Sequence, residues 1–190
     1  MQVSTRGRGF LAVAGGLLWA LGPLVDGLLS AVELLLWVPP LLLLVATRRV
    51  HERDGARLYA HRGLRLGFGA LCVAGLVNAV AVLTQGGLVF LALVGLPAVV
   101  GVVLVAVGSA GIARDWWRAE PVPRWLAVLF GVALPLDPLV NGLLASIVSF
   151  GISVYGLAWV LVGGVLLGRP TALLWGESSD DTLSTRGAGE

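Results

Sequence analysis

The chain has 190 residues, of which 57% are hydrophobic and only 13% are charged, and its formal net charge is +2. A soluble domain is about half apolar and about a quarter charged, so this composition excludes an ordinary soluble protein. All 13 basic residues are Arg, and the absence of Lys excludes proteins that need a Lys Schiff base, such as retinal proteins and pyridoxal enzymes. The single Cys allows no internal disulfide.

Three hydrophobic blocks, residues 10–46, 66–113 and 125–167, contain no basic residue. Each block is about twice as long as the roughly 20 residues of one membrane-spanning helix. We therefore expect each block to cross the membrane, turn and cross back. The fold class predicted is an all-α integral membrane protein with six transmembrane helices in three helical hairpins. The expected helices cover residues 9–25, 28–47, 66–84, 88–113, 124–137 and 142–167.

Every Arg lies outside the three blocks. If the blocks are hairpins, all the Arg-bearing segments fall on one side of the membrane, and the positive-inside rule makes that side cytoplasmic. The sequence thus predicts a multi-pass protein of the cell membrane with both termini in the cytoplasm. Its transmembrane domain would span residues 1–170, and an acidic cytoplasmic tail, expected to be disordered, would span residues 171–190.

The hairpins are expected to turn on the outer side at residues 23–27, 84–87 and 137–142, which are rich in Gly, Pro, Asn and Asp. Segments 23–29 and 138–144 read Pro-Leu-Val-Asp-Gly-Leu-Leu and Pro-Leu-Val-Asn-Gly-Leu-Leu, which suggests that the first and third hairpins are repeats. Pro23 and Pro135 interrupt the helices before these turns. Either the helices continue through a Pro kink or they end early, and short broken helices in matching positions indicate a transport site.

Six polar residues near the outer turns are candidates for a ligand or ion pathway. If a helix begins near Asp26, then Ser30 and Glu33 lie on the same face, and an ionisable group inside a membrane marks a pathway by default. The alternative is structural: Asp26 would cap the helix and Glu33 would reach the interface or a neighbouring helix. Asp137 and Asn141 have the same two readings, with turn or cap chemistry favoured. The full set is Asp26, Ser30, Glu33, Asn78, Asp137 and Asn141.

Small residues recur at helical spacing in four of the expected helices, which predicts close helix packing. Ser146, Ser149 and Ser153 form a stripe on the sixth helix, where a packing seam is preferred to a hydroxyl-lined pathway. Asn78 lies on such a seam of the third helix, where an interhelical hydrogen bond is the alternative to a pathway role. The seams are Ala12, Gly16 and Ala20 in the first helix, Ala70, Ala74, Asn78 and Ala81 in the third, Gly101, Gly108 and Gly111 in the fourth, and Ala145, Ser149 and Ser153 in the sixth. The first inner segment, residues 48–65, carries a cluster of Arg for which we expect contact with anionic lipid headgroups or with a partner. This cluster comprises Arg48, Arg49, Arg53, Arg57 and Arg62.

No pattern points to catalysis, a cofactor, a metal or a nucleic acid. His51, His61 and Cys72 lack the spacing of metal ligands, and no nucleophile and base stand in a recognisable motif. In size and helix count alone, the chain resembles the substrate-binding subunits of energy-coupling-factor transporters. The function expected is a transporter, channel or transport subunit with a polar site near the outer turns. The alternative is a non-catalytic subunit or assembly factor of a larger membrane complex, which would associate with other membrane subunits or with itself.

Overall fold

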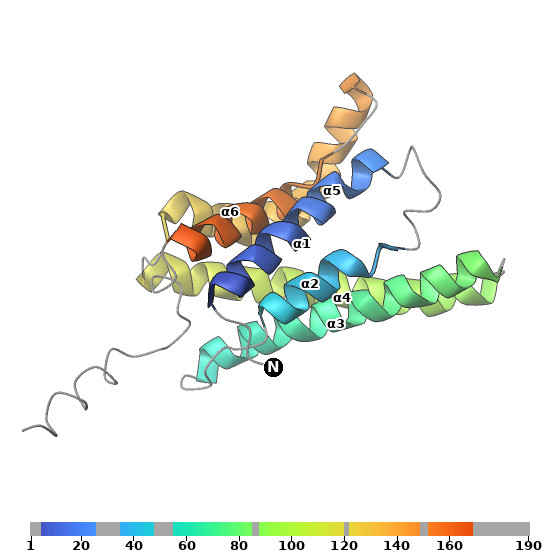
Figure 1. The fold of residues 1–190 in the computed structure, drawn as a ribbon, viewed down its shortest axis with the longest axis horizontal. Coiled ribbons are helices and arrows are strands. Elements are labelled where there is room, and N and C mark those ends of the chain that lie inside the picture. Colours follow the sequence, from blue (N-terminus) through green and yellow to red (C-terminus); the bar gives the residue numbers. More distant parts are fainter. Residues whose placement is uncertain are drawn as a thin grey trace, which may run out of the picture.

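The computed structural model describes residues 5–25, 35–47, 55–84, 88–119, 122–148 and 152–168, and all the regular structure in them is helical. Six helices follow one another (Figure 1): α1 (Thr5–Val25), α2 (Val38–Ala46), α3 (Gly55–Leu83), α4 (Leu88–Ala119), α5 (Arg124–Val148) and α6 (Val154–Gly168). The predicted all-helical class is confirmed. Among the described residues, three segments are long and apolar enough to cross a membrane: Ala60–Leu83, Leu93–Arg118 and Arg124–Asn141. α6 is also apolar but is shorter, at 15 residues.

Glycines allow α1 and α6 to pack closely along their lengths, where Figure 1 shows them side by side. A Cβ added at Gly16 would lie 2.7 Å from the carbonyl oxygen of Gly156, and one added at Gly163 would lie 2.7 Å from the backbone nitrogen of Val13. Since the early part of α1 meets the late part of α6, the two helices are antiparallel. The small-residue seam predicted for the first helix is confirmed.

The helices α3 and α4 form a second antiparallel pair of the same kind (Figure 1). A Cβ at Gly108 would lie 2.6 Å from the backbone nitrogen of Leu64, and a Cβ at Gly101 would lie 3.0 Å from the carbonyl oxygen of Gly67. The seam predicted on the fourth helix is therefore confirmed. The turn predicted at residues 84–87 also agrees with the helix bounds, because α3 ends at Leu83 and α4 begins at Leu88.

An aromatic core joins the two helix pairs through α5. The ring of Phe130 on α5 lies 5.0 Å from Trp116 on α4 and 5.1 Å from Trp159 on α6, between ring centroids. Trp19 on α1 lies 5.5 Å from Tyr155 on α6. Tyr155 also shares a buried hydrogen bond of 2.9 Å with the Ser109 hydroxyl on α4. These contacts hold α5 against both pairs and α6 against α4.

The antiparallel packing brings the described Arg residues to one end of the bundle, here called the arginine end. Ala60 near the start of α3 packs against Gly111 near the end of α4, and the Arg124 guanidinium at the start of α5 lies 5.4 Å from the Trp117 ring centroid. Gly9 at the start of α1 packs against Leu167 at the end of α6. The arginine end carries Arg6, Arg8, Arg57, Arg62, Arg65, Arg114, Arg118 and Arg124.

Several predicted helix boundaries are wrong. α2 begins at Val38 rather than at residue 28, and α6 begins at Val154 rather than at residue 142. α3 begins at Gly55 rather than at residue 66, so Arg57 and Arg62 stand on a helix and not in a loop. The hydrophobic pattern could not locate the first residues of α3, because a helix that projects beyond the apolar layer carries charged side chains there. The outer turn predicted at residues 137–142 does not exist, because α5 continues to Val148 with Pro135 and Pro138 inside it.

The two prolines are tolerated inside α5 at the cost of one helical hydrogen bond each. Their missing N–H groups leave the carbonyls of Gly131 and Leu134, four residues earlier, without the usual donors. The C-terminal part of α5 beyond the prolines extends away from the other helices (Figure 1). α1 likewise continues through Pro23 to Val25. Of the two readings of the Pro-interrupted helices, continuation is confirmed.

Candidate functional site

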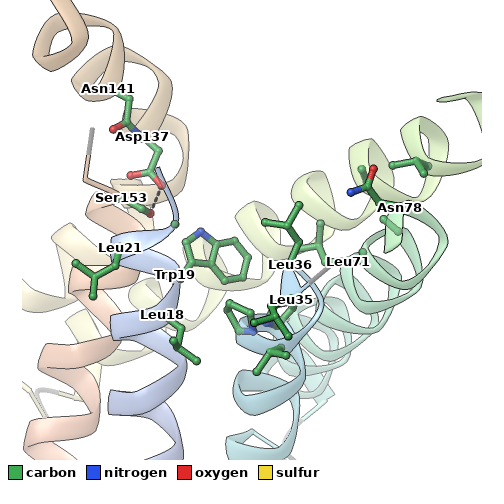
Figure 2. Close-up of a pocket in the computed structure, with 18 residues that line it drawn as sticks. Leu18, Trp19, Leu21, Leu35, Leu36, Leu71, Asn78, Asp137, Asn141 and Ser153 are labelled. Atoms are coloured by element: carbon green, nitrogen blue, oxygen red, sulfur yellow. Dashed lines mark hydrogen bonds between the residues drawn. The ribbon is translucent and has the colours of Figure 1, made fainter. Parts of the chain in front are cut away.

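A cavity of about 740 Å³ lies at the end of the bundle opposite the arginine end. Its walls come from the late parts of α1, α3 and α5, from the early part of α4 and from residues 35–40 at the start of α2 (Figure 2). Most of the lining is apolar: Leu18, Trp19, Leu21, Gly22, Leu35, Leu36, Val38, Pro39, Pro40, Leu71, Ala74, Gly75, Val94 and Ala98. Four polar side chains complete it: Asn78, Asp137, Asn141 and Ser153.

Asp137 and Ser153 form a polar corner of the cavity (Figure 2). Asp137 on α5 is 9% exposed and Ser153, which directly precedes α6, is 2% exposed. The Ser153 hydroxyl donates a hydrogen bond to Asp137 Oδ2, and the backbone N–H of Tyr155 donates to Asp137 Oδ1 over 3.1 Å. The carboxylate therefore caps α6, a helix other than its own.

Ser153 is the N-cap residue of α6. Its Oγ accepts a hydrogen bond from the backbone N–H of Gly156 over 3.2 Å, the usual partner of an N-cap side chain. The backbone N–H of Ser153 donates to the carbonyl oxygen of Ala20 over 3.1 Å, which ties the start of α6 to α1. Two of the N–H groups that a helix start leaves open are thus satisfied by side chains, and the negative carboxylate lies at the positive end of the α6 dipole.

Asn141 stands one helical turn after Asp137, on the same face of α5. Its Oδ1 atom is buried, and among the described residues no donor bonds to it. A buried acceptor without a donor costs on the order of 1–3 kcal/mol. The Asn141 side chain lines the cavity, but its Oδ1 atom has no exposed surface there, so the side chain must rotate before a bound molecule can donate to this oxygen.

Asn78 lies on the opposite wall of the cavity, on α3, and Trp19 lies between the two walls (Figure 2). The foot of this wall is held by close contact between α3 and the start of α2. A Cβ at Gly75 would lie 2.8 Å from the Trp37 backbone nitrogen, and the Cys72 thiol lies 3.8 Å from the Trp37 carbonyl oxygen. Asn78 and Asn141 thus line the same cavity from opposite walls (Figure 2).

Three of the six predicted pathway residues, Asn78, Asp137 and Asn141, line this one cavity. The other three, Asp26, Ser30 and Glu33, lie outside the described residues. Of the Arg cluster, Arg62 is exposed on α3. Arg57 belongs to the same helix, and Arg48, Arg49 and Arg53 lie outside the described residues.

Sequence reasoning places Ser153 on a stripe inside a helix over residues 142–167, with a packing seam preferred to a hydroxyl-lined pathway, and it misses the capping role that the structure shows. The signal for that role is the pattern Gly-Ile-Ser-Val-Tyr-Gly at residues 151–156, since Ser before an apolar run is a common N-cap. Sequence reasoning does not single out Trp19, which also lines the cavity.

Within the described ranges, no three His, Cys, Asp or Glu side chains group together as metal ligands would. Comparisons with protein-family models, with curated proteins and with solved structures found no match for this chain.

Proposed function

We propose that this chain is a small transporter, or the substrate-binding subunit of one, and that the cavity between α1, α2, α3, α4 and α5 is its binding site. The observation that carries the proposal is a cavity of about 740 Å³ with apolar walls and a buried polar corner. Binding sites for small molecules are commonly about 300–1,000 Å³, mostly apolar, with a few placed polar groups.

We further propose that the chain crosses the cell membrane six times in three hairpins, with the arginine end and both termini in the cytoplasm. The segregation of Arg at one end supports this orientation. The cavity then opens toward the outer side. Asp137 is 13 residues after Arg124 in the sequence, about 20 Å along α5, so it would lie within a hydrocarbon layer about 30 Å thick.

Site-directed labelling tests the proposal without knowledge of the substrate. The only native thiol, Cys72, is first replaced in a Cys72→Ala protein, and single cysteines are then introduced. Leu36 lines the cavity and is 40% exposed, whereas Ala133 is fully buried in the core. In membranes, we expect Leu36→Cys to react with a membrane-impermeant maleimide added from outside, and Ala133→Cys to stay unlabelled.

A transport cycle adds a second requirement. In a fraction of the molecules, the cysteine at position 36 should also react with reagent added from the cytoplasmic side, because the site must open alternately to each side. Reaction from the outside alone would favour a binding subunit. Absence of reaction from either side, with the protein folded, would contradict the proposal.

The alternative function is a non-catalytic subunit or assembly factor of a larger membrane complex, and short loops, the lack of a soluble domain and the small-residue seams favour it. Among the described residues those seams are filled within the chain, between α1 and α6 and between α3 and α4, so they call for no partner. Under the alternative, the protein should be unstable or aggregate when purified alone. Light scattering after size-exclusion chromatography in detergent distinguishes the two, and a stable monomer would count against the complex subunit.

A further inference from the structure

Resting on the proposed function, we infer that the cavity selects a small organic cation: a protonated amine on an apolar body. The juxtaposition that points to this class is an unpartnered buried acceptor, Asn141 Oδ1, one helical turn from a buried carboxylate, Asp137, at one end of an otherwise apolar cavity.

The polar corner presents acceptor oxygens, so it favours a ligand that carries hydrogen-bond donors. Asn141 Oδ1 lacks a donor among the described residues and has no exposed surface. Because the Asn141 side chain lines the cavity, its rotation toward a ligand N–H would give this oxygen a donor. Each oxygen of Asp137 accepts one hydrogen bond, from Ser153 or from Tyr155, and each can accept a second. An ammonium group carries three donors and could serve both residues at once, which an alcohol with one donor could not.

The charges around Asp137 disfavour an anionic ligand. The N–H groups of Tyr155 and Gly156 in the first turn of α6 are already bonded to Asp137 and Ser153, so they offer little to an anion. The described lining contains no Arg and no His, and the described Arg residues stand at the opposite end of the bundle. The α6 N-terminus contributes about half a positive charge, which leaves the corner net negative.

The apolar walls indicate that the cation is organic. A hydrated inorganic ion would have to exchange its water for Leu, Val and Pro side chains, which supply no ligands. An apolar body instead gains from contact with these walls. Trp19 adds an indole ring between the two walls (Figure 2), and indole is the aromatic group that attracts cations most strongly.

The test uses three probes with one apolar body: phenylethylammonium, phenylethanol and phenylpropanoate. Binding to the full-length protein in lipid nanodiscs is measured by calorimetry, with protein-free nanodiscs as the blank for partitioning into lipid. We expect the ammonium to bind roughly tenfold more tightly than the alcohol, because hydrogen bonds to charged groups are about twice as strong as neutral ones. The carboxylate probe should show no saturable binding.

Two variants test whether the preference for the ammonium probe over the alcohol depends on the polar corner. Asn141→Leu removes the free acceptor without disturbing the α6 cap, and we expect it to weaken ammonium binding by about fivefold. Asp137→Asn should abolish the preference for the ammonium over the alcohol. Thr84→Val, at the exposed end of α3 outside the cavity, is the matched control and should leave the affinity unchanged.

Three outcomes would overturn the inference: carboxylate binding as tight as ammonium binding, an Asn141→Leu protein with unchanged affinity, or no saturable binding of any probe. If Asp137→Asn fails to fold, the Asn141→Leu result alone decides. The transport proposal fails separately, when a cysteine at position 36 cannot be reached from either side. A reachable cavity without ammonium preference would overturn only the inference on the substrate class.

Discussion

Asp137 has one role that the structure shows, as a cap of α6, and a second that we propose, as the charged group of a cation site. A carboxylate in a membrane helix is costly unless its oxygens are satisfied, and here the Ser153 hydroxyl and the Tyr155 N–H satisfy them. The same hydrogen bonds fix the position of the carboxylate at the cavity wall. The residue is therefore a structural cap of α6, and it is placed where a ligand cation would feel its charge.

We expect Asp137→Ala to destabilise the protein by about 1–3 kcal/mol, because it leaves two buried donors, on Ser153 and Tyr155, without an acceptor. The free energy of unfolding in mixed micelles, followed by circular dichroism, measures the effect. Asp115→Ala removes a carboxylate on α4 at the arginine end and should change stability by less than about 0.5 kcal/mol. Equal stability of the two variants would show that the cap contributes nothing.

At the scale of elements, glycine positions decide how closely the helices approach. On α6, a Cβ at Gly163 would collide with the Val13 backbone at 2.7 Å, whereas a Cβ at its neighbour Gly164 would meet nothing within 4 Å. Backbone atoms of a packed helix cannot give way as a flexible side chain can. The α1–α6 pair thus depends on one of two adjacent glycines and not on the other.

Gly163→Ala should therefore destabilise the protein by about 1–3 kcal/mol through overpacking. Gly164→Ala should be neutral or stabilising by up to about 1 kcal/mol, since Ala has the higher helix propensity. Thermal denaturation of both variants in the same detergent gives the comparison. A loss of stability at Gly164 equal to that at Gly163 would contradict close α1–α6 packing.

At the scale of the whole molecule, the distribution of charge defines two ends. The described Arg residues gather at one end, and the cavity with Asp137 lies at the other. In the Cys72→Ala background, we expect Thr84→Cys, between α3 and α4, to react with an impermeant thiol reagent from outside only. Arg118→Cys, at the other end of α4, should react only after the membrane is opened. Labelling of both positions from the same side would exclude the proposed orientation.

Much of the fold could be predicted from the sequence because it depends on composition and spacing. The α3–α4 turn was marked by Gly and Thr between two apolar runs, and the small residues at helical spacing predicted the seams at Gly16, Gly101 and Gly108. The path of α5 could not be predicted, because Pro in a membrane helix is compatible with a break or with a kink. The turn predicted at residues 137–142 from their Asp, Pro, Asn and Gly was therefore wrong, and it placed Ser153 inside a helix over residues 142–167.

The sequence by itself determined the helical class, the apolar segments and the segregation of Arg, since these follow from which side chains lipid and water accept. Only the tertiary structure decided the site. Asp137, Asn141, Asn78 and Ser153 line one cavity because α5 continues past its prolines and α6 begins anew at Val154. A hydrogen bond between side chains 16 residues apart, such as Ser153 with Asp137, depends on where a helix stops. That in turn depends on packing between helices, which local sequence does not encode.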